Sequence, residues 1–298
     1  MAFALLLPTT YLTIVAWSYA RKEGVLGARF SGGVPRLLVA VAILVILALA
    51  MRFRPASQVV RGLRETVPFL ACLLIYTNLH DTIGFVNPHD VHWWLVAFDK
   101  AIFGVVPCVW AERFIQPRLT DLMQFFYLSF FWIAPSTSLA LLVRRKWTEF
   151  RKATLGVLVC FYIGYVLYVV FPAAPPRLVL VFEFTKNLRG YSEVISTLSA
   201  GAFALLPTDS RAAFPSLHTA VSTVSLIYAW RYARPFFYVL VPFVLGLWAS
   251  TIYLRHHYFV DLVAGWLLAP LAVWVAPHLE AFWARHQVSV GATDTAGG

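Results

Sequence analysis

The sequence predicts an all-α fold: a polytopic bundle of membrane helices, with a six-helix core and one or two further membrane helices at the N-terminus. First, 60% of the 298 residues are hydrophobic and only 13% are charged, whereas about a quarter of a soluble domain is charged. Second, the apolar residues form long runs, which suit helices that satisfy their own backbone groups in lipid. Third, the basic residues lie in short groups between those runs, as they do around membrane helices.

Eight apolar stretches are candidates to cross or enter a membrane. Two of them, residues 3–20 and 37–51, lie near the N-terminus, and the sequence leaves open whether one or both cross. Several stretches are shorter than the ~20 residues of a perpendicular spanning helix, so we expect them to extend into neighbouring residues. The six that form the predicted core are residues 66–80, 120–143, 153–172, 216–230, 236–254 and 261–280.

These stretches divide the chain into three parts. Residues 1–60 hold the N-terminal membrane segments, and residues 61–283 form one domain around the six core helices. Residues 284–298 are mostly small and polar, so we expect a disordered tail there. Two long connections, 81–119 and 173–215, separate core stretches. Connections longer than about 12–15 residues are uncommon in compact domains unless they have a function.

Both connections carry signs of the membrane interface. The first combines tryptophan and phenylalanine with polar residues such as His92 and Asp99. Aromatic residues concentrate at the headgroup level, so we expect one or two helices lying along that layer. The second connection begins with three prolines and continues with an apolar piece, residues 194–206, which is another candidate for the interface.

The distribution of basic residues predicts the orientation. Arginine and lysine are concentrated in short connections on one side of the core, for example in residues 144–152 and 231–234. Because cytoplasmic loops carry the excess of basic residues, residues 81–119, 173–215 and 255–260 are expected on the extracytoplasmic face. The formal charge of +10 is thus spread in a way that favours a lipid bilayer over nucleic acid as the partner.

Three polar clusters lie at helix ends on this predicted face. Residues 172–177 end one core stretch, residues 214–218 open the next, and residues 255–261 connect the last two. Ionisable groups are costly in a membrane, roughly 2.5–3.5 kcal/mol each at the centre of a helix and less at its ends. Their concentration on one side therefore indicates a functional site.

The residue types in these clusters point to phosphoryl transfer. His257 and Asp261 are four residues apart, so on a helical turn the carboxylate can reach one ring nitrogen. That contact fixes the tautomer and leaves the other nitrogen as a nucleophile or base. His218 comes from a different helix end and can supply a proton to a leaving group.

The candidates for binding the phosphate are a helix start and three arginines. The start of a helix offers free N–H groups and a favourable dipole to an anion, and guanidinium groups bind phosphate through paired hydrogen bonds. The residue at the helix start is Ser216. The arginines, in order of preference, are Arg177, Arg255 and Arg211.

At these positions the sequence resembles the type 2 phosphatidic acid phosphatase superfamily. Pro215-Ser-Leu-His218 is similar to the second signature of that family, and Ser250 with His257 and Asp261 matches the spacing of the third. Thr251 stands where the third signature has an arginine. The usual first signature is absent, and Ala174-Pro-Pro-Arg177 occupies its place.

The departures resemble one branch, the inositol phosphorylceramide synthases, also called inositol phosphotransferases. That branch has a proline-rich first motif and a His-His-Tyr third motif, here His256-His257-Tyr258. Asp99-Lys-Ala-Ile-Phe-Gly104 and Trp110 are similar as well, and the resemblance spans residues 66–280.

The resemblance implies an integral membrane enzyme of six core helices, with its site on the extracytoplasmic face and with no metal or cofactor. It implies that His257 is the nucleophile, His218 the acid and base, and Asp261 the orienting group. The substrate would be a membrane phospholipid or lipid phosphate. The branch favours transfer of a phospho-headgroup to a lipid alcohol, and the superfamily leaves a phosphatase, with water as acceptor, as the alternative.

Other interpretations of the same residues remain. Asp261 could simply cap the last helix, His256 suits a structural role, and Arg211 could be an ordinary interfacial arginine. A metal site is disfavoured because adjacent histidines seldom bind one ion from a short loop. A proton-coupled transporter is disfavoured because the polar groups lie at helix ends on one side and no inverted repeat is evident.

Overall fold

The computed structural model describes residues 33–50, 86–204 and 211–295, together with Tyr11 and scattered positions between 60 and 84. In this part of the chain the regular structure is helical, apart from one isolated bridge between Ala173 and Ala212. The helices are α2 (Gly33–Ala50), α4 (His92–Phe103), α5 (Pro107–Ala111), η3 (Glu112–Phe114), α6 (Pro117–Leu128), α7 (Phe130–Val143), α8 (Trp147–Val170), α9 (Pro176–Val179), η4 (Val181–Glu183), α10 (Glu193–Ala204), α11 (Leu217–Tyr232), α12 (Arg234–Tyr253) and α13 (Phe259–Thr295).

Three helices of the described part are long and apolar enough to cross a membrane: α8, α12 and α13 as far as Phe282. The count rises to five if two bent pairs, α4 with α5 and η3, and α6 with α7, each form one span. The predicted all-α membrane bundle is thereby confirmed. The expected stretch 3–20 lies outside the described residues apart from Tyr11, and 66–80 is described only at scattered positions. Helix α2 covers most of the stretch expected at 37–51.

The stretch expected at 120–143 is two helices, bent by 45°. The break falls at Ser129, whose hydroxyl donates to the carbonyl of Phe126. Serine side chains compete in this way with the helical hydrogen-bond ladder and bend helices. The hydrophobic run alone does not report this break, because apolar residues continue on both sides of it.

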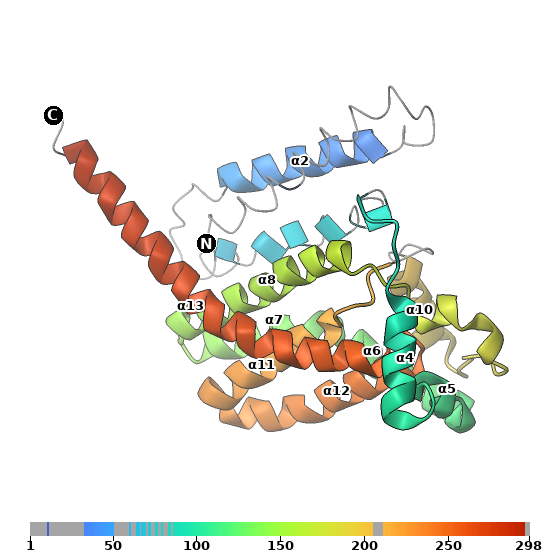
Figure 1. The fold of residues 1–298 in the computed structure, drawn as a ribbon. Helices are drawn as coiled ribbons and strands as arrows, with labels where there is room; N and C mark the ends of the chain where they lie inside the picture. The colour runs from blue at the N-terminus through green and yellow to red at the C-terminus, as the bar shows by residue number, and fades with distance from the viewer. Residues whose placement is uncertain are drawn as a thin grey trace.

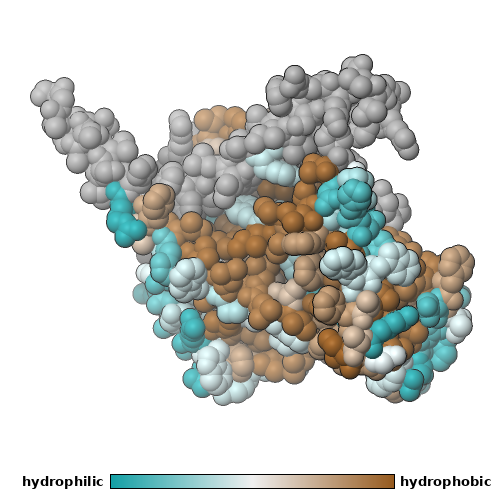
Figure 2. All heavy atoms as spheres, viewed as in Figure 1, coloured by the Kyte–Doolittle hydropathy of each residue, from teal (hydrophilic) through white to brown (hydrophobic). Residues whose placement is uncertain are grey.

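The core of the bundle lies between α8, α11 and α13, with α7 and α12 packed around α11. Figure 1 shows α8, α11, α12 and α13 running side by side, while α4 crosses the beginning of α13. Hydrophobic residues cover the middle of the face drawn in Figure 2, and hydrophilic residues gather towards its ends. Such a belt is what a bilayer requires of the surface of a membrane protein.

The first connection folds into α4, α5 and η3. It is helical as expected, and the expected place of its helices along the headgroup layer stays a prediction. Gly104 ends α4 in the left-handed region, at φ 74°, where glycine is favoured over residues with a side chain. One side of α4 is exposed, with Trp93 and Trp94 at 59% and 73%. Leu95, Val96 and Asp99 form its buried side. Near the end of α4 the ring of Phe103 packs edge to face on Phe259 of α13.

Helix α13 is fixed near both ends of its apolar part. At its far end, Glu280 forms an ion pair of 3.0 Å with Arg151 of α8. The helix then continues to Thr295, which differs from the disordered tail expected at 284–298. Extending an existing helix costs far less than starting one, and residues 284–287 (Ala-Arg-His-Gln) do not break helices.

The first turns of α11 and α13 are in backbone contact. The amide of Ser216 donates to the carbonyl of Asp261 at 3.0 Å. Gly265 faces the same contact: a Cβ atom there would lie 2.6 Å from the carbonyl oxygen of Ser216 and 2.8 Å from Cβ of Thr219. Only a residue without a side chain allows this approach, as at close helix crossings in membranes.

We expect Gly265→Ala to destabilise the bundle, because the added methyl group meets backbone atoms that cannot rotate away. Overpacking of this kind costs typically about 1–3 kcal/mol. The measurement is the thermal unfolding midpoint of the purified protein in detergent. Gly156→Ala is the matched control, since its Cβ would meet Val224 at 3.4 Å, an ordinary contact. Equal unfolding midpoints for Gly265→Ala and Gly156→Ala would contradict the view that a side chain at Gly265 disrupts the contact between α11 and α13.

Candidate active site

The three polar clusters found in the sequence meet in one place, joined by backbone hydrogen bonds. Ala173 donates to the carbonyl of Arg211 at 3.0 Å and accepts from the amide of Ala213 at 2.9 Å, which joins the first cluster to the segment before the second. The amide of Arg177 donates to the carbonyl of Arg255 at 3.0 Å, which joins the first cluster to the third. The contact between α11 and α13 joins the second to the third.

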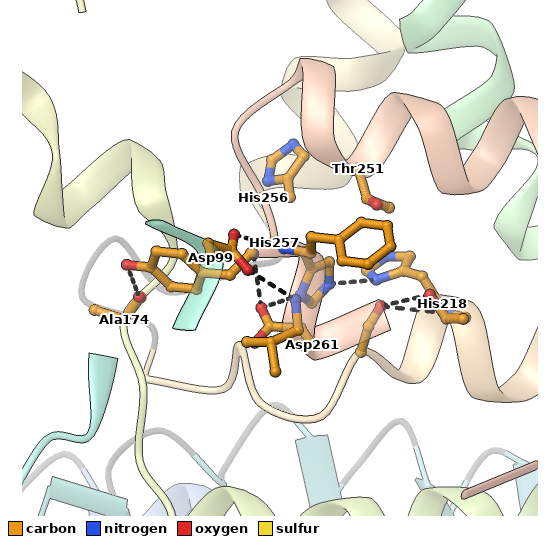
Figure 3. A network of polar contacts seen from close by, with 12 residues as sticks. Asp99, Ala174, His218, Thr251, His256, His257 and Asp261 are labelled. Carbon is orange, nitrogen blue, oxygen red and sulfur yellow. Dashed lines mark hydrogen bonds and ion pairs between the residues drawn. The ribbon is translucent and has the colours of Figure 1, made fainter. Parts of the chain in front are cut away.

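The end of α12 sets the direction of the two adjacent histidines. The carbonyl of Thr251 accepts the amides of His256 at 2.8 Å and His257 at 3.2 Å. Arg255 lies between them and the helix in the left-handed region, at φ 64°, which is uncommon for a residue with a side chain. This turn ends the helix and sends the neighbouring rings to different partners, as Figure 3 shows.

His257, Asp261 and His218 form a continuous chain of polar contacts (Figure 3). Nδ1 of His257 lies 3.1 Å from Oδ2 of Asp261, and its Nε2 lies 3.1 Å from Nδ1 of His218. Because a carboxylate only accepts, Nδ1 of His257 carries the hydrogen and Nε2 keeps its lone pair. His218 then donates to that lone pair. The sequence-based prediction that the three residues come together agrees with this geometry.

Burial keeps His257 uncharged. It is 4% exposed, and the pKa of its imidazole is lowered from 6.5 to about 3. Burial is the main cause of the lower pKa, a hydrogen bond to the backbone of Ala213 opposes it, and the Arg177 guanidinium adds to it. A neutral imidazole is the form that has a free lone pair. The ring is therefore in the state that a nucleophile or base requires at neutral pH.

Two aromatic rings pack against His218, which is half-buried. It is the second residue of α11, and its imidazole centroid lies 5.0 Å from that of Tyr127 and 4.5 Å from that of Phe130. The hydroxyl of Ser222 donates to the carbonyl of His218 one turn later. This packing holds the ring against α6 and α7 and leaves its Nδ1 edge directed at His257.

His256 turns away from Asp261 and contacts Arg177. Its Nδ1 is hydrogen-bonded to Nη1 of Arg177, and its ring stacks on Tyr127 with centroids 4.6 Å apart. Burial lowers the pKa of His256 well below 6.5, and the Arg177 charge lowers it further. A neutral ring can accept from the guanidinium, so His256 holds Arg177 beside the His257–His218 pair.

Arg255 and Arg211 each face a carboxylate. The guanidinium of Arg255 donates to the carbonyl of Lys186 at 2.7 Å, lies 3.7 Å from Glu112 and sits 3.9 Å above the ring of Phe184. It thus stabilises the strained turn at the end of α12 and the connection between α9 and α10. Nε of Arg211 pairs with Asp90 at 2.6 Å, before α4 begins.

Ser216 is buried and caps α11. Its hydroxyl accepts from the amide of Thr219 at 3.3 Å and from the hydroxyl of Thr219 at 3.1 Å. A serine in this position satisfies one of the free amides of the first turn. The side chain is 0% exposed, so its described contacts are those of a helix cap.

Sequence reasoning assigned no role to two buried carboxylates near the site. Oδ2 and Oδ1 of Asp99 accept the amides of Phe259 and Val260, at 2.9 and 3.1 Å, across 160 residues of sequence. Glu112 accepts the amide of Lys186 at 2.6 Å. The available signals for Asp99 were the resemblance of Asp99–Gly104 to one branch of the family and its place as the one acidic residue of the aromatic-rich helix α4. Nothing in the sequence pairs Glu112 with a segment so far along the chain.

Among the described residues, no group of three or more histidine, cysteine, aspartate or glutamate side chains is arranged to hold a metal ion. The three cysteines, Cys72, Cys108 and Cys160, are buried and unpaired. The residues that meet at the site are its histidines, its carboxylates and Arg177.

Comparison with known proteins identifies one family model and three similar proteins. The model of the PAP2 superfamily matches residues 93–275. The chain is 27% identical over 199 residues to the phosphoinositol dihydroceramide synthase of Bacteroides thetaiotaomicron, which covers 60% of this chain and 65% of that protein. It is 32% identical over 119 residues to the catalytic subunit of inositol phosphorylceramide synthase from Saccharomyces cerevisiae, covering 36% of this chain and 29% of that protein.

A third relative, the inositol phosphorylceramide synthase of Candida albicans, is 34% identical over 125 residues, 36% of this chain and 25% of that protein. The chain therefore covers less than two thirds of the length of each of these relatives. No solved structure matches it significantly. The family match includes His218, His257 and Asp261 and confirms the resemblance inferred from these residues, so the chain belongs to the PAP2 superfamily.

Proposed function

We propose that this protein is an integral membrane enzyme that moves a phospho-headgroup from a phospholipid to a lipid alcohol through a phosphohistidine. The observation that carries the proposal is the chain of contacts from Asp261 through His257 to His218. A carboxylate, a neutral imidazole and a second imidazole in line provide an orienting group, a nucleophile and an acid. The names of the relatives support a lipid acceptor.

In the first half-reaction, Nε2 of His257 attacks the phosphorus of the donor lipid, and the bond from phosphorus to the lipid oxygen breaks. His218, protonated beside the anionic phosphate, gives its proton to that leaving oxygen. The Nδ1 hydrogen of His257 stays on the ring, and its bond to Asp261 stabilises the positive charge that develops. The two histidines touch in this structure, so the phosphoryl group separates them as it enters.

In the second half-reaction, neutral His218 accepts the proton of the acceptor hydroxyl while the oxygen attacks phosphorus. The bond between phosphorus and Nε2 breaks, which returns His257 to its neutral form and leaves His218 protonated for the next donor. If the acceptor is water, the same steps make the protein a lipid-phosphate phosphatase, which is the alternative function. The rings of Tyr127 and Phe130 cover part of His218 and would limit access of water, which favours the transferase.

Arg177 is the proposed clamp for the phosphate oxygens. It is held by His256 beside the histidine pair, and a guanidinium bound to a neutral acceptor keeps its full charge for an anion. Arg255 and Arg211 remain alternatives, but each already faces a carboxylate. Ser216 would contribute through the orientation of the first amides of α11, where an anion is favoured.

The site would face the extracytoplasmic side, as the distribution of basic residues predicts. A proton-coupled transporter receives less support, because the polar groups described here cluster at one end of the helices. A relay for protons across the membrane would need such groups at successive depths.

We expect His257→Ala and His218→Ala each to abolish turnover, since each removes a group that forms or breaks bonds. Asp261→Asn should lower kcat by roughly 10⁴-fold, the cost of losing the orienting carboxylate in a related arrangement. Turnover is measured on the purified protein, and thermal unfolding in detergent checks that each variant is folded. Near wild-type turnover in either histidine variant would refute the assigned roles.

The acceptor is identified by product analysis. The purified protein is incubated with labelled phosphatidylinositol or phosphatidic acid, with and without a short-chain dihydroceramide. A transferase yields a new labelled lipid only when the alcohol is present. Release of labelled phosphate from phosphatidic acid, or of labelled inositol phosphate from phosphatidylinositol, that is independent of the alcohol would establish water as the acceptor instead. No product of either kind would favour the transporter.

The low pKa of His257 predicts a dependence of stability on pH. The unfolded imidazole titrates near 6.5 and the folded one near 3, so between these values the unfolded state binds the extra proton. The free energy of unfolding should therefore fall by up to about 1.4 kcal/mol per pH unit as pH drops below 6.5. Above 6.5 this histidine contributes no change.

Thermal unfolding midpoints between pH 5 and 8 test this, with His257→Gln as the reference that cannot titrate. The wild-type midpoint should drop more steeply than that of the variant below pH 6.5. Parallel curves would show that His257 is not kept neutral by the fold.

A further inference from the structure

We propose that Asp99 is a positioning residue for the His257–Asp261 pair, an assignment that rests on the proposed function. Asp99 lies on α4, outside the three polar clusters that meet at the site, in the segment Asp99–Gly104 that also resembles the branch. It reaches the site through the backbone of α13, as Figure 3 shows. Its role would be to keep Asp261 available for His257.

The start of α13 is buried at Tyr258 and Asp261 and half-buried at Phe259 and Val260, so its amides need acceptors within the protein. The first amides of any helix lack partners within the helix, and leaving a buried one unsatisfied costs about 1–3 kcal/mol. Asp99, which is 0% exposed, accepts the amides of Phe259 and Val260. Asp261 accepts the amide of Tyr258 through the oxygen that also contacts His257.

Asp99 and Asp261 thus accept different amides at the start of α13. An aspartate in the first turn of a helix ordinarily turns back to accept the free amides there. Here Asp99 has already taken two of them, so Asp261 keeps Oδ2 on Nδ1 of His257. Its other oxygen, Oδ1, is buried without a hydrogen-bond partner, and would accept the released amides if Asp99 were absent.

The placement of α4 suits this function. Gly104 ends the helix five residues after Asp99, and Phe103 packs edge to face against Phe259 at a centroid distance of 4.9 Å. The carboxylate is therefore held against α13 by packing on the same crossing. No described contact joins Asp99 to His257, His218 or Arg177, so it would act only through the start of α13.

We expect Asp99→Ala to lower kcat by roughly 10–100-fold, the usual effect of losing a group that supports a reacting one, with little change in KM. Asp99→Asn, which keeps one acceptor, should fall between this variant and the wild type. The assay uses the full chain with labelled phosphatidylinositol and short-chain dihydroceramide. If Asp99→Ala does not fold, the Asn variant carries the same comparisons.

A double-mutant cycle separates positioning from general stability. If Asp99 acts through Asp261, adding Asp99→Ala to Asp261→Asn should change kcat by less than about twofold, because the contact it protects is already lost. Losses that multiply would overturn the proposal, and so would a wild-type kcat for Asp99→Ala.

Asp121→Ala is the matched control, because Asp121 also accepts backbone amides before a helix, those of Tyr191 and Ser192 ahead of α10. It should lower the unfolding midpoint but leave kcat within about twofold, as expected for independent sites. An equal loss of kcat in this control would reduce Asp99 to a structural role.

If His257→Ala and Asp261→Asn retain turnover, the proposed function fails. If they lose turnover while Asp99→Ala does not, only the assignment of Asp99 fails.

Discussion

The backbone contact between the first turns of α11 and α13 is the constraint on which the site depends. Gly265 allows the two helices to approach until Ser216 can donate to the carbonyl of Asp261. That approach brings His218 on one helix and His257 ahead of the other within hydrogen-bonding distance. The same crossing buries Tyr258 and Asp261 at the start of α13, so the polar groups there must find partners inside the protein. The close packing at Gly265 is thus what places the ionisable side chains of His218 and His257 together.

Much of this could be read from the sequence, because the relevant signals are local. Long apolar runs predict membrane helices, and the spacing of His257 and Asp261 predicts their contact. His218 could be added because two further clusters lie at helix ends on the same predicted side. The break at Ser129 and the helical continuation beyond residue 283 were not predicted, since hydrophobicity reports neither a hydroxyl that bends a helix nor the extension of a formed one.

The sequence could not predict which groups contact the isolated charged residues. Arg255 and Arg211 carry the right chemistry for a phosphate, yet Glu112 and Asp90 face them from segments more than a hundred residues away. Asp99 similarly meets α13 only after the chain has folded. Local spacing cannot predict such pairs, because their geometry depends on how α4, α5 and the connection before α10 cross the bundle.

The attachment of α13 at both ends has a consequence for the lipid around it. From Asp261, tied to α11, to Glu280, tied to α8, the helix rises roughly 29 Å at 1.5 Å per residue, close to the ~30 Å hydrocarbon thickness of a typical bilayer. A helix pinned at two levels cannot slide along its neighbours to follow a thinner or thicker membrane. Hydrophobic mismatch must then be met by tilting of the whole bundle or by deformation of the surrounding lipid.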